Sequence, residues 1–305
     1  MTVVLALLID WFVGDPPGVW RRTGHPVTWF GGLIGALDRR LNVRPSRKAK
    51  GVVAIVVAIL AFALPATVLT GFLDALPGPL ETIALALLAS TLLAHKSLNT
   101  HVARVTDAAS IEEARAAVSM IVGRDVAALD EAGVARASVE TLSESLSDGV
   151  VAPAFWLAIG GLPGIVAYKV VNTADSMIGH LTPRYAKFGW AAAKLDDAMN
   201  FVPARITAGL IMLTRPSTFR RRETIIDDAG RHVSPNAGWP EAAMASALGI
   251  ALGGPRTYEG ERVDGVWLNP RGRAPTMVDV RRAIAIGNQA AAIQIALYAL
   301  IFLLV

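Results

Sequence analysis

The 305-residue sequence contains no cysteine, and only 18% of its side chains are charged. Without cysteine the chain forms neither a disulfide nor a thiolate metal site, while metals bound by histidine, carboxylate or phosphate remain open. With 53% hydrophobic residues and a mean hydropathy of +0.46, it has too little polar sequence to cover a soluble protein of this length. The composition therefore indicates a membrane protein.

Several signature motifs are also missing. Nothing matches the phosphate-binding loop G-x-x-x-x-G-K-[ST], the nucleophile elbow G-x-S-x-G or the zinc motif H-E-x-x-H. A nucleotide would therefore be bound by a different structural motif. The net charge of +4 arises from 29 basic and 25 acidic residues scattered along the chain. This small excess gives no reason to expect a nucleic-acid partner, and in a membrane protein it reports loop orientation.

Long apolar segments recur from end to end. Gly51–Leu73 and Ala283–Val305 are long enough to cross a hydrocarbon core of about 30 Å. Leu80–Ala94 follows the turn Pro77-Gly78-Pro79, which predicts a hairpin with Gly51–Leu73. Phe201–Leu213 and Pro240–Leu252 are too short to predict spans.

The segment Gly149–Val171 is long enough to span but contains Gly160-Gly161-Leu162-Pro163-Gly164 at its centre. Such a run breaks a helix, and the freed backbone groups need partners from protein or water. A full span would place the polar stretch 172–200 outside the cell. We favour the alternative, in which the break turns the chain back and that stretch lies inside.

Basic loops set the orientation. The loop 38–50 is rich in arginine and lysine, which predicts a cytoplasmic position. We expect one membrane domain over 1–305, with a cytoplasmic insert at 95–148 that contains helices at Ile111–Ile121 and Ala127–Leu146. A second cytoplasmic region, with a short apolar helix, is expected at 214–282. The predicted fold is all-α: a polytopic helical membrane protein with broken, re-entrant helices and a cytoplasmic helical insert.

Three polar blocks lie at the edges of these apolar segments. In the first, Glu140, Glu144 and Asp148 recur every four residues, so on a helix they form one stripe. Like charges at this spacing repel unless a cation lies among them, and magnesium favours such oxygen ligands. A solvated helix face is the alternative. We favour function because the stripe leads directly into an apolar segment.

In the second block, Lys169, Asn172, Asp175 and Ser176 share one helical face. Ionisable groups at membrane depth are costly and tend to mark functional sites, although a capped helix end with an extended lysine gives the same pattern.

The third block contains Asp196 and Asp197, followed by Asn200 and Arg205. Asp196 and Asn200 align one helical turn apart, and paired aspartates suit a metal–phosphate site. An acidic first turn favoured by the helix dipole is the alternative. Arg205 lies within an apolar stretch, where it needs an anion such as an aspartate or a substrate phosphate.

Taken in order, the motifs of this chain resemble those of the adenosylcobinamide-phosphate synthase family of cobalamin biosynthesis. The likeness covers nearly the whole chain, and its several blocks in order make it more specific than one motif. It departs at His180, where the family suggests tyrosine. The matching blocks are Gly14-Asp15-Pro16, His25-Pro26-Val27, Arg136-Ala137-Ser138-Val139-Glu140-Thr141, Asp148-Gly149-Val150-Val151-Ala152-Pro153, Tyr168-Lys169, Asn172-Thr173-Ala174-Asp175-Ser176-Met177, Leu195-Asp196-Asp197 with Asn200, Pro203-Ala204-Arg205, Ser234-Pro235-Asn236-Ala237-Gly238, and Leu252-Gly253-Gly254 with Tyr258.

The resemblance implies an ATP-dependent ligation that joins a propionate of adenosylcobyric acid to an amino-alcohol phosphate, such as aminopropanol phosphate. Activation through an acyl phosphate is the expected route. Lys169 and Arg205 would clamp anionic oxygens, while Asn172, Ser176, Asn200 and His25 would bind substrate. One of the carboxylates would accept the amine proton. Magnesium would be held by some of Glu140, Glu144, Asp148, Asp175, Asp196 and Asp197, of which all but Asp148 are also candidate catalytic residues.

The expected partners are the two substrates and the lipid bilayer, and the expected location is the cell membrane, with the active site facing the cytoplasm. A homo-oligomer or a complex with other membrane enzymes of the pathway is left open. The competing interpretation is an ion-coupled transporter of a corrinoid or another anion, because such carriers also have broken helices with buried carboxylates. A non-catalytic membrane scaffold is a third possibility, but it would not need so many intramembrane charges.

Overall fold

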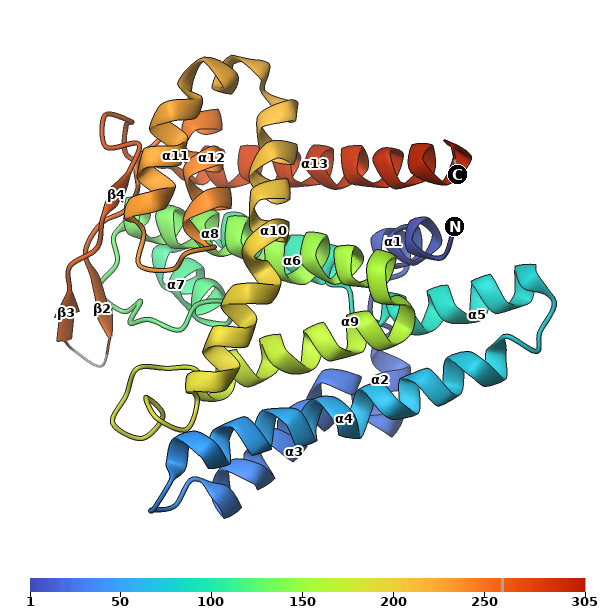
Figure 1. Ribbon diagram of the computed structural model, residues 1–305. Helices are drawn as coiled ribbons and strands as arrows, with labels where there is room; N and C mark the ends of the chain where they lie inside the picture. The colour runs from blue at the N-terminus through green and yellow to red at the C-terminus, as the bar shows by residue number, and fades with distance from the viewer. Residues whose placement is uncertain (259–260, 305) are drawn as a thin grey trace. The chain divides into compact units, whose positions relative to one another are not determined.

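The computed structural model describes residues 1–258 and 261–304, and the fold is all-α (Figure 1). Contacts divide the chain into two compact units. Unit 1 comprises Met1–Ala94, Ala152–Asn200 and the residues from Tyr298 onward, and unit 2 comprises His95–Val151 and Phe201–Leu297. Two helices, α10 (Trp190–Thr214) and α13 (Met277–Leu304), contribute residues to both units.

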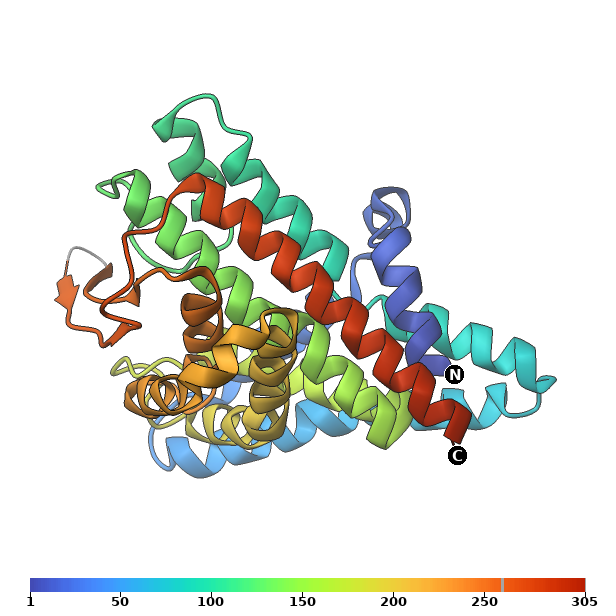
Figure 2. The same cartoon turned by 90° about the horizontal axis from the view of Figure 1, so that it is seen from above.

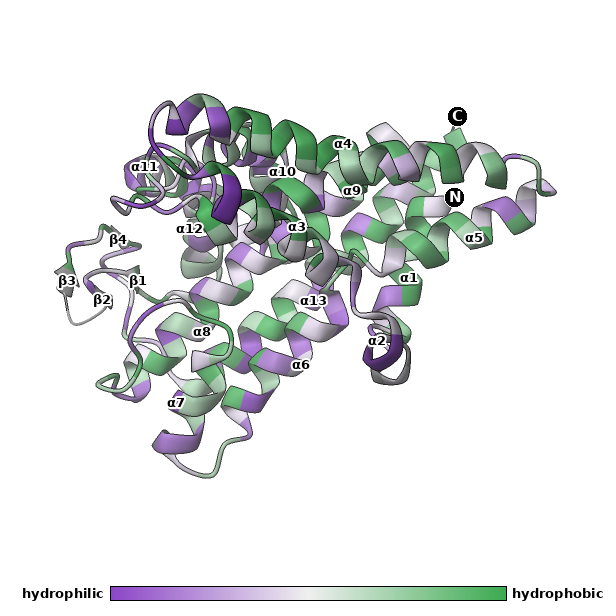
Figure 3. Cartoon of the chain, turned by 90° about the horizontal axis from the view of Figure 1, so that it is seen from below, coloured by the Kyte–Doolittle hydropathy of each residue, from purple (hydrophilic) through white to green (hydrophobic). Residues whose placement is uncertain are grey.

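The remaining helices of unit 1 are α1 (Thr2–Phe12), α2 (Pro17–Thr23), α3 (Pro26–Leu41), α4 (Arg47–Leu73), α5 (Gly78–Ser90) and α9 (Ala152–Ile178). The helix α4 packs against α9 and α3, and α1 packs against α5. Along α4, valine and leucine side chains stay exposed on one face, and Figure 3 shows hydrophobic colour over most of this helix. Because the described residues leave this face of α4 exposed, it is suited to contact lipid.

The long predicted segment Gly51–Leu73 is helical throughout, and so is 283–304; Leu80–Ala94 and Pro240–Leu252 are helical only as far as Ser90 and Leu248. Within residues 1–258 and 261–304, four helical segments are long and apolar enough to cross a membrane: Arg47–Leu73, Gly78–Thr106, Glu131–Ile178 and Met277–Leu304. The predicted hairpin is present, because α4 and α5 are joined by the short turn after Leu73. Val305, the last residue of one predicted span, lies outside the described residues.

The glycine-rich break predicted in the 149–171 segment is also confirmed. Within α9, Gly161 adopts φ +58° and ψ −154°, a conformation that residues with a side chain rarely reach. Gly164 then lies directly against the backbone carbonyl of Trp156, a contact that a straight helix could not make. The chain reverses its direction here (Figure 1). The second half of α9 therefore returns toward the end from which the first half came.

Unit 2 contains α6 (His95–Thr106), α7 (Ile111–Ser119), α8 (Glu131–Leu146), a π-helical turn η1 (Ser147–Val151), a 3-10 turn η2 (Pro216–Arg221), α11 (Arg222–Arg231) and α12 (Gly238–Leu248). Two short antiparallel pairs follow, β1 (Leu252–Gly253) with β4 (Trp267–Leu268) and β2 (Arg256–Tyr258) with β3 (Glu261–Val263). Figure 2 shows α13 running beside α6 and α8; Asn99 donates to Asn288 over 2.7 Å, and Gly287 lies against Leu142.

The two helices predicted within the insert are present, but α8 begins later than expected. The carboxylate of Asp130 accepts a hydrogen bond from Gly133 N over 2.7 Å, which caps the helix there. Residues 127–130 therefore precede the helix. At its other end α8 runs through η1 into α9, so Asp148 lies in a wider π-helical turn.

Candidate functional site

The second and third polar blocks meet in unit 1. Lys169, Asn172 and Asp175 lie on α9, and Asp196 and Asn200 lie on α10. Asp196 Oδ2 accepts from Asn200 Nδ2 over 3.0 Å, and its Oδ1 accepts from Asn172 Nδ2 over 3.4 Å. Lys169 Nζ donates to Asn172 Oδ1 over 3.3 Å. Hydrogen bonds therefore connect one lysine, two amides and the Asp196 carboxylate in one cluster, and the charge of Asp175 acts on Asp196.

A buried tyrosine supports this cluster from within the fold. Tyr168 is fully buried, and its hydroxyl donates to Asn200 Oδ1 over 2.9 Å. This bond fixes the orientation of the Asn200 amide, so its NH₂ group points to Asp196. Tyr168 appears in the sequence only as part of a matching motif, and the structure gives it a positioning role.

The carboxylate of Asp196 lies in an electrostatically unfavourable place. Burial, followed by the charge of Asp175, raises the pKa of Asp196 to about 6, although hydrogen bonds from Asn200 and Asn172 act in the opposite direction. A bound cation would relieve both the desolvation and the repulsion between the two aspartates. Magnesium fits such a donor set, because it is usually held by one or two carboxylates together with substrate phosphates.

The cluster is not a complete metal site made by protein alone. Across residues 1–258 and 261–304, no group of three or more His, Asp or Glu side chains is arranged to hold a metal ion. Asp197, next to Asp196, instead forms an ion pair with Lys194 at 3.0 Å. The hydroxyl of Ser176 donates to the Asn172 carbonyl over 2.9 Å and is exposed.

His25, expected to bind substrate, has local partners. Its Nδ1 accepts from Val27 N over 3.2 Å at the start of α3, and its Nε2 lies 3.2 Å from Asp15 Oδ1. The ring also packs edge-on against Trp20, with 4.9 Å between ring centroids. These contacts use both ring nitrogens, which gives His25 a structural role in the N-terminal turn.

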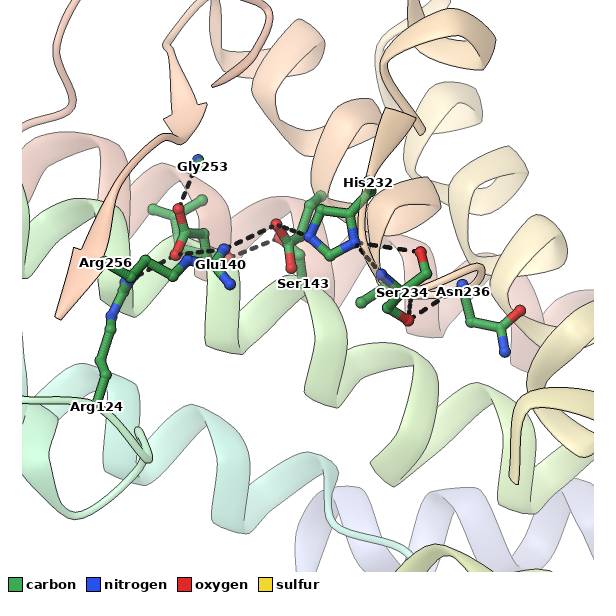
Figure 4. A network of polar contacts seen from close by, with 11 residues as sticks. Arg124, Glu140, Ser143, His232, Ser234, Asn236, Gly253 and Arg256 are labelled. Carbon is green, nitrogen blue, oxygen red and sulfur yellow. Dashed lines mark hydrogen bonds and ion pairs between the residues drawn. The ribbon is translucent and has the colours of Figure 1, made fainter. Parts of the chain in front are cut away.

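The first polar block lies in unit 2, where Glu140 is the centre of a buried network (Figure 4). One oxygen of Glu140 accepts from Gly253 N over 2.6 Å. The other is 2.7 Å from Arg124 Nη2 and 3.2 Å from Arg256 Nη2. Only 5% of the Glu140 side chain is exposed, so two arginines compensate its buried charge. The carboxylate thereby fastens the segment 253–256 to α8.

Next to this network lies an acid that the sequence did not indicate as functional. Glu241, at the start of α12, has one oxygen 3.7 Å from Arg256 Nη2 and 3.8 Å from His232 Nε2. Burial, followed by the charges of Glu140 and Glu144, raises the pKa of Glu241 well above its ordinary value. In the sequence, Glu241 is noticeable only as an acid within an apolar stretch. An acid in the first turn of a helix is common, so this position alone does not indicate a function.

Arg205 has neutral neighbours. Its Nη1 donates to Asn236 Oδ1 and to the Phe201 carbonyl, each over 2.8 Å. Its guanidinium lies 3.8 Å from the centroid of the Phe201 ring and 4.6 Å from that of Trp239. Burial lowers the pKa of Arg205. Arg205 forms no carboxylate ion pair within the described part of the chain, so it can still accept an anionic group.

The expected magnesium ligands are thus divided between the units. Asp175, Asp196 and Asp197 belong to unit 1, while Glu140, Glu144 and Asp148 belong to unit 2. Within unit 2, Glu140 is engaged with arginines and Glu144 is exposed. Unit 1 therefore contains the better candidate for a cation and phosphate site.

Comparison with known proteins gives this geometry a context. The sequence profile of the family described as CobD/Cbib protein matches residues 3–287. The chain belongs to this family. A CobD/Cbib member from Sinorhizobium fredii, named cobalamin biosynthesis protein CobD, is 48% identical over 301 residues, covering 94% of this chain and 91% of the relative.

Two further relatives carry the same name. The protein from Rhizobium meliloti is 45% identical, covering 94% of this chain and 91% of its own length. That from Rhodobacter capsulatus is 44% identical, with 95% and 93% covered. No solved structure matches the chain. Membership of the CobD/Cbib family supports a role in cobalamin biosynthesis.

Proposed function

We propose that this protein is an ATP-dependent carbon–nitrogen ligase of cobalamin biosynthesis. It joins the carboxylate of adenosylcobyric acid to the amine of an amino-alcohol phosphate of the aminopropanol phosphate type, giving adenosylcobinamide phosphate. Family membership and the motif resemblance support the reaction. The observation that carries it is the cluster of Asp175, Asp196, Asn172, Asn200 and Lys169 in unit 1, because this group suits a phosphate-bearing substrate.

The proposed chemistry has two steps. A carboxylate oxygen of the corrinoid acid attacks the γ-phosphorus of ATP, the bond to the β-phosphate oxygen breaks, and ADP leaves. The amine nitrogen then attacks the acyl carbon, inorganic phosphate leaves, and the nitrogen loses a proton. Activation is needed because a carboxylate and an amine do not condense unaided in water. Catalysis of phosphoryl transfer is mainly positioning and charge stabilisation, the properties that this cluster offers.

Asp175 and Asp196 would hold magnesium, which when bound supplies positive charge to ATP phosphates. Asn200 and Asn172 orient Asp196 by hydrogen bonds to its two oxygens. Lys169, which donates to Asn172, lies where its ammonium can meet an anionic substrate oxygen. Arg205, which belongs to unit 2, keeps its predicted role of binding an anionic substrate oxygen, because no carboxylate among the described residues pairs with it.

We further propose that the protein acts in the cell membrane with this cluster facing the cytoplasm, where ATP is present. The test is a ligation assay with the purified full-length protein in detergent, varying amine, nucleotide and metal. Product and ADP should form together, and only when corrinoid acid, amine, ATP and magnesium are all present.

The variants Asp175→Asn and Asp196→Asn should each lose most of this activity, whereas Asp227→Asn, an exposed aspartate on α11, serves as the matched control. Normal turnover by both variants would contradict the proposed magnesium site. Movement of labelled corrinoid across vesicles without ATP, and no ligation, would favour the transporter instead.

A further inference from the structure

The turn between α3 and α4 and the connection between α9 and α10 form one basic surface in unit 1. Arg47 donates to the carbonyl of Pro183 over 3.3 Å and also to that of Arg184. The Arg184 carbonyl further accepts from Asn42 Nδ2 over 3.4 Å. Through these contacts the structure brings together two charged segments that are far apart in sequence. We call this surface the basic collar, consisting of Arg39, Arg40, Arg44, Arg47, Lys48, Lys50, Arg184 and Lys187.

The positive charge of the collar is largely uncompensated. Its neighbouring acid, Asp38, is only 7% exposed and already pairs with Arg184 Nη2 at 2.6 Å. Arg39, Arg40, Arg44 and Lys187 are exposed and form no ion pair with the residues that the structure describes. Exposed cations that lack internal partners are available to an external anion.

The collar lies at the point where α4 becomes apolar. The first turn of α4 is basic, and exposed Val52, Val53, Val56 and Val57 follow directly on the helix. Figure 3 shows this change from hydrophilic to hydrophobic colour along α4. Since α4 is 27 residues long and apolar enough to cross a membrane, its basic start lies at the level of lipid head groups.

Two side chains near the basic collar, Trp190 and Leu181, are also of the kind found at the level of lipid head groups. Trp190, at the start of α10, is 42% exposed and lies 3.7 Å below the ammonium of Lys48, measured from the ring centroid. Leu181, in the α9–α10 connection, is 90% exposed. Tryptophan is typical of the membrane interface, and an exposed leucine beside it can enter the lipid.

We propose that the basic collar binds the phosphate head groups of anionic phospholipids. A free phosphate would find the same cations, but only a lipid also satisfies the apolar face of α4 that begins beside them. Clusters of this size next to a transmembrane helix attract anionic lipid, with each cation near the surface contributing favourably. This binding does not depend on the proposed ligase activity.

The test uses the full-length protein in an uncharged detergent and native mass spectrometry of bound lipids. Phosphatidylglycerol should bind about tenfold more tightly than phosphatidylcholine with the same acyl chains, and salt should weaken this preference. The variant R39Q/R40Q/R44Q/K187Q should lose the preference. The variant R220Q/R221Q/R222Q/R271Q removes as many exposed cations from unit 2 and should keep it.

Three results would overturn the proposal. The first is an unchanged preference in the collar variant, and the second is an equal loss in both variants, which would assign the effect to net charge. The third is full displacement of phosphatidylglycerol by inorganic phosphate, which would assign the collar to soluble anions. If the fourfold collar variant does not fold, R44Q/K187Q, with one change in each segment, replaces it and must weaken the preference.

Discussion

Gly179 leaves no room for a side chain beside Asp175: a Cβ at this position would overlap the Asp175 carboxylate. Gly179 N also donates to the Asp175 carbonyl over 2.7 Å, where α9 ends. The glycine therefore allows the carboxylate to occupy its place in the cluster. We predict that Gly179→Ala displaces this carboxylate and lowers ligation at least about tenfold, with weaker apparent magnesium affinity.

The control for this prediction is Gly209→Ala. Gly209 lies within α10, and nothing stands within 4 Å of a Cβ added there. In a helix interior this change is neutral or slightly stabilising. Magnesium titrations of the ligation rate would compare the two alanine variants with wild type. Equal magnesium dependence in all three proteins would show that the place of the Asp175 carboxylate does not matter.

The raised pKa of Asp196 predicts a stability that depends on pH. Because its folded pKa of about 6 exceeds the ordinary value of 3.8, the folded state binds the proton more tightly than the unfolded state. Stability contributed by this group is therefore present at low pH and lost as pH rises from about 4 through about 6. Without magnesium, Asp196→Asn should remove this loss and unfold a few degrees higher than wild type at pH 7.5.

The measurement is thermal unfolding in detergent at pH 5 and pH 7.5, with and without magnesium. At pH 5 the difference between wild type and Asp196→Asn should shrink. Magnesium should stabilise wild type more than the variant at pH 7.5, because only wild type retains the repelling pair of Asp175 and Asp196. A difference that stays constant across pH would argue against the ionisation of Asp196 as its cause.

The features that could be predicted from the sequence depend on local pattern. The continuous apolar run predicts the helix α4, and the glycine- and proline-rich segment Gly160–Gly164 predicts the break in α9. Both predictions depend only on residues that are close together in the sequence. The pairing of Asp196 with Asn200 follows in the same way from one helical turn.

The features that could not be predicted depend on distant contacts. Glu140 accepts from Gly253, which lies 113 residues later, and its arginines come from segments with no periodic pattern. Of the stripe of Glu140, Glu144 and Asp148, Glu140 is buried, whereas Glu144 is exposed. However, the sequence does not reveal that the positive charge beside Glu140 comes from Arg124 and Arg256.

This network predicts a structural effect of changing Glu140. Glu140→Ala would leave Arg124 and Arg256 without their shared carboxylate and would free the backbone of Gly253. Removing one partner of a buried ion pair costs about 3–5 kcal/mol, which corresponds to a fall in Tm of roughly 5–10 °C.

Thermal unfolding of the purified protein would measure the change, with Glu112→Ala as the control. Glu112 is exposed on α7, and substitutions at such positions usually change stability by less than about 0.5 kcal/mol. If Glu140→Ala kept the wild-type Tm, the network would not stabilise unit 2. If it kept its Tm but lost ligation, Glu140 would act in the reaction instead.

The reversal of α9 at Gly161 makes a prediction about membrane topology. Because the chain turns back there, Ser176 should return to the side on which α8 enters, the predicted cytoplasmic side. The absence of cysteine permits single-cysteine labelling without background.

In sealed vesicles of known orientation, an impermeant thiol reagent should reach Ser176→Cys and Ala49→Cys from the same cytoplasmic side. Ala49 precedes the apolar part of α4. Ala75→Cys, after α4, should react only from the opposite side, since one span separates it from Ala49. All three positions are exposed. Labelling of Ser176→Cys together with Ala75→Cys would mean that the segment crosses the membrane despite its break, and it would place Asp175 away from cytoplasmic ATP.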